Sequence, residues 1–178
     1  MGAYVTYQEY LKIRKPIMNT PTGCEFFLDK GAVPEHQISR VVSCDADPLG
    51  IQLTLYQYQS CPFCCKVRAF LDYYGLPYNV IEVNPVFRQQ MTWSKWKKVP
   101  VLLASSDNGF YQLNDSSMII SSIMSLLHDK KKDLHELTKC FPYVSYMKED
   151  GKEVTEILNK YNLMFQDAPV DRTKDYLM

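Results

Sequence analysis

Apolar and polar side chains alternate over residues 51–56, and this period of two predicts a β-strand there. A turn then leads to Pro62, which suits the first position of a helix because its missing N–H group costs nothing there. Apolar side chains recur at helical spacing after it, at Val67, Phe70, Leu71 and Tyr74. Gly75 and Pro77 then end the predicted helix in the order typical of helix C-termini.

A second strand is predicted over residues 78–83, so the helix connects two strands that should be parallel and linked by a right-handed crossover. Residues 101–104 and 110–113 predict a hairpin, because turn-forming residues separate two short apolar runs. Polar residues 114–117 then cap a further helix. This order of elements predicts an α/β domain with a small mixed sheet and flanking helices, complete by about residue 128.

The regions outside this domain carry weaker patterns. Residues 1–50 are interrupted repeatedly by proline and glycine, which predicts an irregular N-terminal lead-in. Within the domain of residues 51–128, Asn84 and Pro85 resemble the cap and first residue of a short helix. Residues 129–178 are predicted to form a linker with one amphipathic helix. The apolar face of that helix comprises Val154, Ile157, Leu158, Tyr161 and Phe165.

Composition narrows the class of protein. Hydrophobic residues make up 46% of the chain and charged residues 22%, which is typical of a globular protein rather than a disordered one. The formal net charge is zero, so nothing in the composition indicates a nucleic-acid partner, which normally requires a basic surface. No apolar run approaches the ~18–20 residues that cross a bilayer, and the N-terminus lacks the apolar core of a signal peptide.

Three of the six cysteines form a cluster, which favours redox, metal or nucleophilic chemistry over a disulfide scaffold. Cys61 stands directly before Pro62, where the unpaired N–H groups and dipole of a helix N-terminus favour a thiolate. Cys64 lies one turn deeper on the same face, the layout of an attacking and a resolving thiol. An inert pair and a zinc site are the alternatives, although zinc prefers four ligands and a second pair is missing. Cys65, rotated by about 100° around the helix, is predicted to pack.

The stretch from Leu55 to Cys64 resembles the start of glutaredoxins, with Cys61-Pro62-Phe63-Cys64 as its motif. Val99-Pro100 before a strand is similar to the Val-Pro element of that family, in which the proline peptide bond is cis. Further stretches resemble the membrane-associated prostaglandin E synthase 2 family, namely residues 53–76, 83–85, 98–100, 112–120 and 151–156. The resemblance covers about residues 51–165. It implies a thioredoxin-like α/β fold of the glutaredoxin or glutathione-transferase N-terminal type, a mixed sheet with flanking helices.

The resemblance also implies a set of catalytic residues. Cys61 would be the catalytic thiol, with Tyr58 and Phe63 beside it and Cys64 as the second thiol. Tyr58 could donate a proton, since a phenol three residues before the sulfur can lie near it. A surface position for Tyr58 is an equal alternative.

A second group of residues is implied to bind glutathione. The backbone at Val99 and Pro100 would pair with the tripeptide as an added strand. Asp115 and Ser116 would hold its γ-glutamyl end, because a carboxylate suits a helix N-terminus and Asp115 can pair with an ammonium group. Plain helix capping is the alternative for both. Three lysines beside the Val-Pro element could reach the glycyl carboxylate or form a solvated face, Lys95, Lys97 and Lys98.

The implied function is a glutathione-dependent isomerase that converts prostaglandin H2 to prostaglandin E2, with haem as a further group held through glutathione. The substrate would be prostaglandin H2 or another small lipid peroxide, and a homodimer is compatible with the resemblance. The resemblance implies either association with the Golgi membrane or a cytoplasmic location, and membrane association rests on this kinship alone. No metal ligand set is expected.

Two alternatives remain open. A glutaredoxin-like thiol–disulfide oxidoreductase is favoured by Cys64, because an isomerase needs no resolving thiol. A non-catalytic module that binds glutathione or haem is favoured by length, because family members carry a second, all-helical domain that residues 129–178 are expected to lack.

Overall fold

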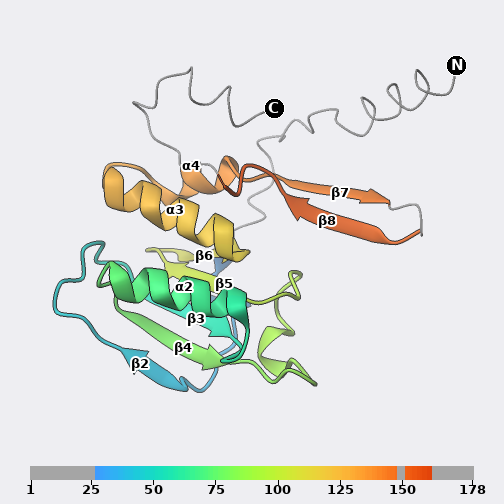
Figure 1. Ribbon diagram of the computed structural model, residues 1–178, viewed down its shortest axis with the longest axis horizontal. Coiled ribbons are helices and arrows are strands. Elements are labelled where there is room, and N and C mark those ends of the chain that lie inside the picture. Colours follow the sequence, from blue (N-terminus) through green and yellow to red (C-terminus); the bar gives the residue numbers. More distant parts are fainter. Residues whose placement is uncertain (1–26, 148–150, 162–178) are drawn as a thin grey trace, which may run out of the picture.

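The computed structural model describes residues 27–147 and 151–161, which form a six-stranded mixed sheet, helices and a separate two-stranded hairpin (Figure 1). The strands of the sheet follow the order β1-β6-β5-β3-β4-β2. Their bounds are Phe27–Asp29 (β1), Arg40–Val42 (β2), Leu53–Gln57 (β3), Tyr78–Glu82 (β4), Val101–Ser105 (β5) and Gly109–Asn114 (β6). Two short 3-10 helices accompany them, η1 (Lys30–Ala32) and η2 (Gln89–Met91).

The centre of the sheet confirms the predicted crossover unit. β3 and β4 are parallel, with Leu55 opposite Val80, and helix α2 (Pro62–Tyr73) connects them. β5 pairs antiparallel with β3 and then forms a hairpin with β6. A parallel pair needs such a long connection, whereas the antiparallel pair closes through a short turn.

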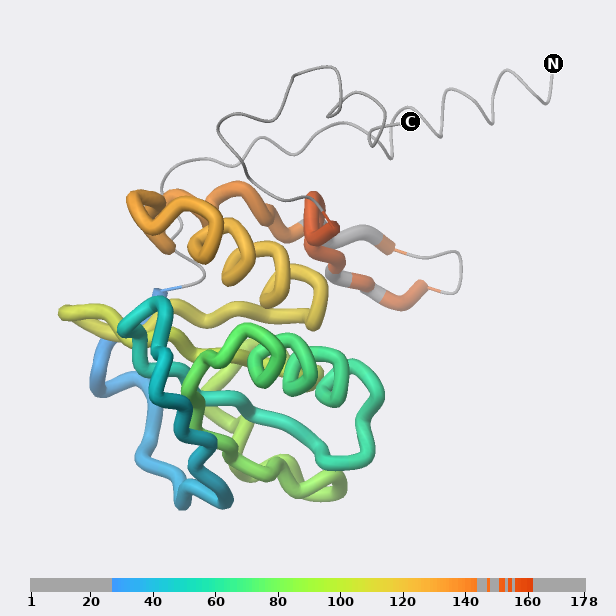
Figure 2. Tube along the Cα trace, turned by 60° about the vertical axis from the view of Figure 1, so that its left-hand side comes forward, coloured from blue at the N-terminus to red at the C-terminus, as the bar shows by residue number. Residues whose placement is uncertain are grey.

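The helices cover one face of the sheet (Figures 1 and 2). α2 lies beside α3 (Ser116–His128), and the shorter α4 (Leu134–Lys139) packs near α3. Their buried side chains join those of the strands in one core that includes Leu55, Val67, Leu71, Ile119 and Ile123. Full burial of a side chain of this size contributes roughly 1.5–3 kcal/mol each. This core therefore fixes the two long helices relative to the sheet.

Gly75 ends α2 in a way that other residues would strain. Its φ of +63° lies in the left-handed region, which glycine adopts without steric penalty. A Cβ atom at this position would also lie 3.1 Å from the Cys44 sulfur. The predicted stop signal at Gly75 is thus confirmed, and it lets the chain turn sharply from α2 into β4.

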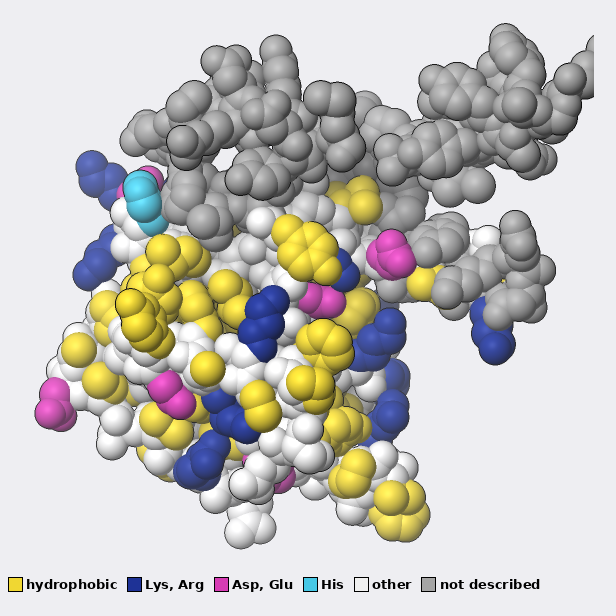
Figure 3. Space-filling model, viewed as in Figure 1, with side chains coloured by type: hydrophobic (Ala, Val, Ile, Leu, Met, Phe, Trp, Pro, Cys, Tyr) yellow, Lys and Arg dark blue, Asp and Glu magenta, His cyan; other side chains and the backbone are white. Residues whose placement is uncertain are grey.

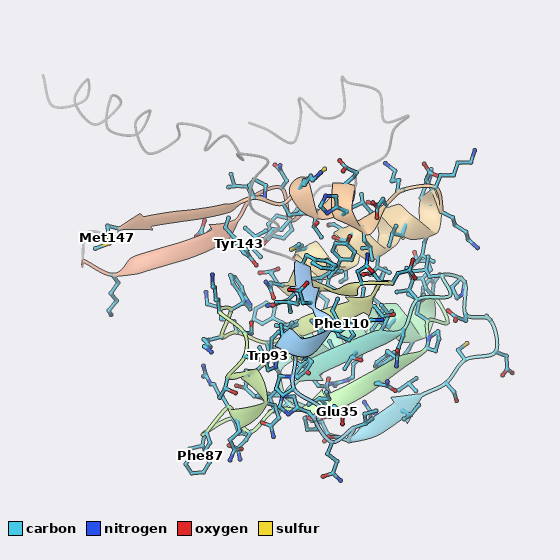
Figure 4. All side chains as sticks on the ribbon, turned by 180° about the vertical axis from the view of Figure 1, so that it is seen from behind. Glu35, Phe87, Trp93, Phe110, Tyr143 and Met147 are labelled. Carbon is cyan, nitrogen blue, oxygen red and sulfur yellow. The ribbon has the colours of Figure 1, made fainter. Side chains whose placement is uncertain are left out.

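The opposite face of the sheet is covered by irregular segments instead of helices. Its core contains Tyr56, Ile81, Met91, Val101 and Leu103, packed beneath residues 28–36 and 83–99. Aromatic rings support it: Tyr56 meets the Trp93 ring edge-to-face at 5.4 Å between centroids. Figure 4 shows Trp93 and Phe110 on this side of the molecule.

The prediction of an irregular lead-in over residues 1–50 is wrong for residues 27–29 and 40–42, which form strands. β1 pairs with β6 and β2 pairs with β4, so both edges of the sheet come from this region. Each strand has only three residues, too few for a period of two to be recognised. Hydrogen bonds to the sheet hold them, such as Ser39 N–H to the Val80 carbonyl at 2.8 Å. Residues 1–26 lie outside the described residues.

The predicted short helix at Asn84 and Pro85 is a turn. The Asn84 side chain accepts hydrogen bonds from the backbone N–H groups of Val86 and Phe87, both at 2.9 Å. Arg88 then takes a φ of 51°, which ends any helical course. Asparagine favours such local side-chain turns. The predicted side-chain capping by Asn84 is therefore present, but it closes a turn and does not start a helix at Pro85.

The predicted amphipathic helix over residues 153–165 is also wrong within the described residues. β7 (Tyr143–Met147) and β8 (Glu153–Ile157) form an antiparallel hairpin there. The β-branched residues of β8 favour a strand, and Ile157 is buried in the main core. Residues 162–165 lie outside the described residues. The division of the chain at residues 50 and 128 stays a prediction.

Candidate active site

Backbone pairing in the sheet brings the three predicted motifs to one end of the molecule. Tyr56 of β3 lies opposite Val101 of β5, and Val101 lies opposite Asn114 of β6. The Cys-Pro-Phe-Cys motif follows Tyr56 after a short turn, Pro100 directly precedes Val101, and Asp115 directly follows Asn114. Figures 1 and 2 both show the N-termini of α2 and α3 at this same end. The sheet thus assembles the site from segments far apart in the sequence.

Cys61 occupies the N-cap position of α2. Its backbone is extended (φ −75°, ψ 124°), and its carbonyl accepts the first helical hydrogen bond from Cys65 N–H at 2.9 Å. The Cys61 N–H donates to the Tyr58 carbonyl at 3.2 Å, which holds the preceding turn. The Cys61 side chain is half-buried and makes no capping hydrogen bond within the described part of the chain. The first-turn N–H groups are therefore not capped by this side chain, and Cys61 stands at the positive end of the helix dipole.

Cys64 differs sharply from Cys61 although both lie on the same helix face. Its side chain is fully buried. Burial raises the pKa of the Cys64 thiol to about 12, and hydrogen bonding to the Cys61 side chain also raises it, against a lowering effect of the Tyr58 backbone. Cys64 is therefore a neutral thiol at physiological pH, placed beside the Cys61 sulfur.

Cys65 was predicted to pack, but its side chain is exposed. Its sulfur lies 3.0 Å from the Arg68 guanidinium, which also donates to the Gln59 carbonyl at 3.2 Å and to the Gln57 side chain. Arg68 thus ties α2 to the turn that precedes Cys61. The sequence signal for it was an arginine one helical turn after Cys65, which is too common to single out.

The Val99-Pro100 peptide bond is cis, as the family resemblance implied. Pro100 is buried, and Val99 is half-buried against the second core. Lys97 is occupied structurally, because its ammonium group donates to the carbonyls of Met91 and Thr92 at 3.0 and 3.2 Å. This contact favours a structural role for Lys97 over the predicted reach to a glycyl carboxylate.

Asp115 occupies the N-cap of α3 in a strained backbone conformation, with φ 69° and ψ 137°. Such values are unusual for a residue with a side chain and are concentrated at ligand sites. One carboxylate oxygen accepts from Ser117 N–H at 2.8 Å, which confirms the capping alternative. The other lies 3.4 Å from the Lys160 ammonium group. Ser116 is buried directly after it.

Two lysines that the sequence reading missed converge on this helix end. Lys66 of α2 donates to the Ser117 hydroxyl at 3.2 Å, and Lys160 comes from the segment after β8. Lys66 lies five positions beyond Cys61, but nothing in the sequence indicated that it would reach α3. Figure 3 shows basic, acidic and hydrophobic side chains interspersed over α2 and α3 on this face.

Comparison with known proteins agrees with this geometry. Residues 53–107 match the glutaredoxin family. The chain contains a glutaredoxin domain. That domain spans β3, α2, β4 and β5, and so it holds both the cysteine motif and the cis-proline element. The predicted thioredoxin-like α/β fold is confirmed.

Two relatives extend the similarity beyond the glutaredoxin domain, and both are named prostaglandin E synthase 2. The relative from Danio rerio is 44% identical over 160 residues, which cover 84% of this chain and 41% of the relative. The relative from Mus musculus is 50% identical over 117 residues, which cover 66% of this chain and 30% of the relative. The chain is homologous to prostaglandin E synthase 2 and spans less than half the length of either relative.

A buried polar network supports the α3 end of the glutaredoxin-like site. Gln112 donates to the hydroxyl of Ser94 and to the side-chain carbonyl of Asn114, both at 2.8 Å. Asn114 in turn donates to the Tyr143 hydroxyl. Trp96 stacks on Tyr143 with ring centroids 5.7 Å apart. Figure 4 places Tyr143 at the base of the β7–β8 hairpin, so the network connects the hairpin to the residue before Asp115.

Two features of the described residues bear on the predicted cofactors and partners. Among residues 27–147 and 151–161, no group of three or more His, Cys, Asp or Glu side chains is placed to hold a metal ion. In the same part of the chain, no helix is both long and apolar enough to span a bilayer. Neither finding tests the catalytic roles of Cys61, Cys64 and Tyr58 or the binding roles of Phe63, Val99, Pro100, Asp115 and Ser116, which stay predictions.

Proposed function

We propose that this chain provides the glutathione-binding part of a prostaglandin-E synthase, which isomerises prostaglandin H2 to prostaglandin E2 at Cys61. The observation that carries the proposal is the half-buried Cys61 sulfur at an uncapped helix N-terminus, at the same end of the sheet as Asp115. The name shared by both relatives supports the choice of substrate. The glutaredoxin domain supports the use of glutathione.

The described residues offer contacts for the cysteinyl and γ-glutamyl parts of glutathione. The backbone at Val99 would pair with the cysteinyl part as an added strand, which places the glutathione sulfur toward Cys61. Asp115 would accept the γ-glutamyl ammonium group, and the first-turn N–H groups of α3 beside Ser116 would receive its carboxylate. Phe63, 61% exposed next to Cys61, offers an apolar surface for the lipid. When bound, glutathione supplies a second thiol at the reacting centre.

The reaction is an isomerisation, so its atoms and electrons balance within the substrate. The O–O bond breaks, one ring carbon loses its proton, and the oxygen on that carbon becomes a ketone. The other oxygen takes up a proton and becomes a hydroxyl group. We assign to the Cys61 sulfur an attack on the oxygen of the carbon that becomes the ketone, so that an S–O bond forms as the O–O bond breaks, while Tyr58 donates a proton to the other oxygen. That carbon then loses its proton to the Tyr58 phenolate, the C=O bond forms, and the S–O bond breaks to release the Cys61 sulfur. The neutral Cys64 thiol donates a hydrogen bond toward Cys61 and takes no part in covalent chemistry.

A second candidate is a glutaredoxin-like thiol–disulfide oxidoreductase. The contact between Cys64 and Cys61 favours it, because a resolving thiol must reach the first sulfur. The raised pKa of Cys64 speaks against it, since the thiolate is the attacking species in disulfide exchange. Haem held through glutathione, a homodimer and membrane association also remain proposals, and no step given above uses them.

The test is incubation of the purified chain with prostaglandin H2 and glutathione, with the products identified by mass spectrometry. Wild-type protein should form prostaglandin E2 faster than buffer with glutathione, and Cys61→Ser should abolish the excess. Cys64→Ser should keep it, whereas an oxidoreductase assayed on a protein disulfide would lose activity with either change. Cys65→Ser is the matched control, because this exposed thiol lies next to Cys64 and should not matter. Equal rates for wild type and Cys61→Ser would refute the proposal.

A further inference from the structure

We infer that Asp115 and Lys160 together form a receptor for the zwitterionic amino-acid end of glutathione, in which Lys160 binds the α-carboxylate. This inference rests on the proposed use of glutathione and names the residue that completes its γ-glutamyl site. Lys160 would be a specificity-determining residue contributed by the segment after β8, outside the glutaredoxin domain of residues 53–107.

The position of Lys160 is fixed by the fold. Its carbonyl accepts a hydrogen bond from the Ser121 hydroxyl on α3 at 2.8 Å. Just before it, the Asn159 side chain donates to the Cys140 carbonyl at 3.0 Å, and Leu158 N–H donates to the Pro142 carbonyl at 2.9 Å. The backbone around Lys160 is therefore anchored at several points. The ammonium group of Lys160 therefore reaches Asp115 from a fixed backbone position, unlike that of an ordinary surface lysine.

The ion pair is loose and accessible, as a receptor for a ligand should be. The Lys160 nitrogen lies 3.4 Å from the Asp115 oxygen, and their side chains are 26% and 28% exposed. Charge-assisted hydrogen bonds of this kind are usually about 2.7–2.9 Å long. The other Asp115 oxygen is held by Ser117 N–H, so the oxygen facing Lys160 is the one that can exchange partners.

A zwitterion matches this pair in charge and spacing. The γ-glutamyl end carries an ammonium group and a carboxylate on one carbon atom, so it can insert between the two side chains. Asp115 then pairs with the ammonium group and Lys160 with the carboxylate, and each charge keeps an opposite partner throughout. Lys66, on the Ser117 hydroxyl, adds positive charge on the carboxylate side. A ligand with only one of the two charges would leave either Lys160 or Asp115 unpaired.

The experiment measures binding of glutathione and of two analogues by calorimetry, one with the α-carboxylate converted to an amide and one lacking the α-amino group. Wild-type protein should bind each analogue about tenfold more weakly than glutathione, since each loses one charge-assisted contact. Lys160→Gln should bind glutathione about five- to tenfold more weakly and the amide analogue as wild type does, so its preference for acid over amide should fall to about twofold or less. The analogue lacking the amino group reports on Asp115 in parallel.

The controls separate this inference from the proposed function. Lys139→Gln is the matched variant, because it breaks a lysine–carboxylate pair with Glu136 on α4, and it should bind all three ligands as wild type does. Lys160→Arg keeps the charge and should retain most of the preference for the acid, which shows that a fall in Lys160→Gln is not a folding defect. An undiminished preference in Lys160→Gln would overturn the inference. Failure of wild-type protein to bind glutathione would overturn the proposed function instead.

Discussion

The N-termini of α2 and α3 lie at the same end of the sheet but differ in their N-caps. At α2, the N-cap side chain is a thiol that leaves the first turn uncapped within the described residues. At α3, the Asp115 carboxylate caps Ser117 N–H and pairs with Lys160. A helix without a cap forgoes stability and offers its N–H groups to a reacting charge, whereas a capped one is stable and offers its side chains to a ligand. In the proposed function, the chemistry belongs to the α2 end and the binding to the α3 end.

The largest expected effect separates these two roles in one variant. Cys61→Ser should lower kcat for prostaglandin E2 formation by at least about 100-fold, because a serine hydroxyl is a far weaker nucleophile than a cysteine sulfur. The Kd of glutathione should change by less than about threefold, a small difference in free energy, since the binding charges lie on α3. Product analysis and calorimetry on the same preparation measure both quantities. A parallel loss of kcat and of affinity for glutathione would contradict this prediction, because it would mean that the α2 and α3 ends do not have separate roles.

A second prediction uses the buried thiol beneath Cys61. Because the folded-state pKa of Cys64 is raised to about 12, the folded protein holds this proton where the unfolded chain loses it. The resulting stability is fully present below pH 9.0 and is lost as pH rises toward about 12. Urea unfolding over this range should show a smaller loss of stability with pH for Cys64→Ala than for wild type. Burial also raises the pKa of Tyr56 to about 12, so Tyr56 contributes to the loss of stability over the same pH range. Only the difference between Cys64→Ala and wild type therefore reports on Cys64.

The sequence predicted the α2 end better than the α3 end, for a physical reason. Cys61, Pro62, Gly75 and the apolar stripe of α2 are local signals, and each was confirmed in position by the structure. Asp115 was identified by the same kind of signal. Lys160 reaches Asp115 across 45 positions of sequence, from the segment after β8, a region that was predicted to be a helix. Contacts of that range follow from packing, which no local pattern encodes.

The same limit explains the two edge strands. β1 and β2 are three-residue strands, and each pairs with residues that lie 36 or more positions away along the chain. Asn84 shows the reverse case, in which a correct local signal for side-chain capping led to a turn because Arg88 leaves the helical region. In both cases the sequence shows only the local preference of each residue. What was missing was the tertiary context that decides how a local signal is used.

A third prediction tests the capped end. Asp115→Ala should lower the stability of the protein by about 1 kcal/mol, because α3 loses its N-cap. It should also weaken glutathione binding about tenfold, because the γ-glutamyl ammonium group loses its partner. Thermal unfolding and calorimetry measure the two effects, while kcat at saturating glutathione should stay near the wild-type value. Asp115→Asn separates them further: the amide oxygen can still cap Ser117 N–H, so stability should largely return while affinity stays low.

The smallest effect is the most direct test of the comparison, because it has the opposite sign. Serine is a favoured N-cap residue, so in Cys61→Ser the hydroxyl can accept a hydrogen bond from a first-turn N–H group of α2. This inactive variant should be more stable than wild type by about 0.5–1 kcal/mol, which urea unfolding resolves, with Cys65→Ser as the control on the exposed side of α2. A gain at Cys61 beside a loss at Asp115 would show that α2 forgoes a cap in favour of a reactive sulfur. A loss at both positions would mean that the Cys61 thiol itself stabilises the helix, and the contrast between the two helix ends would then be one of degree.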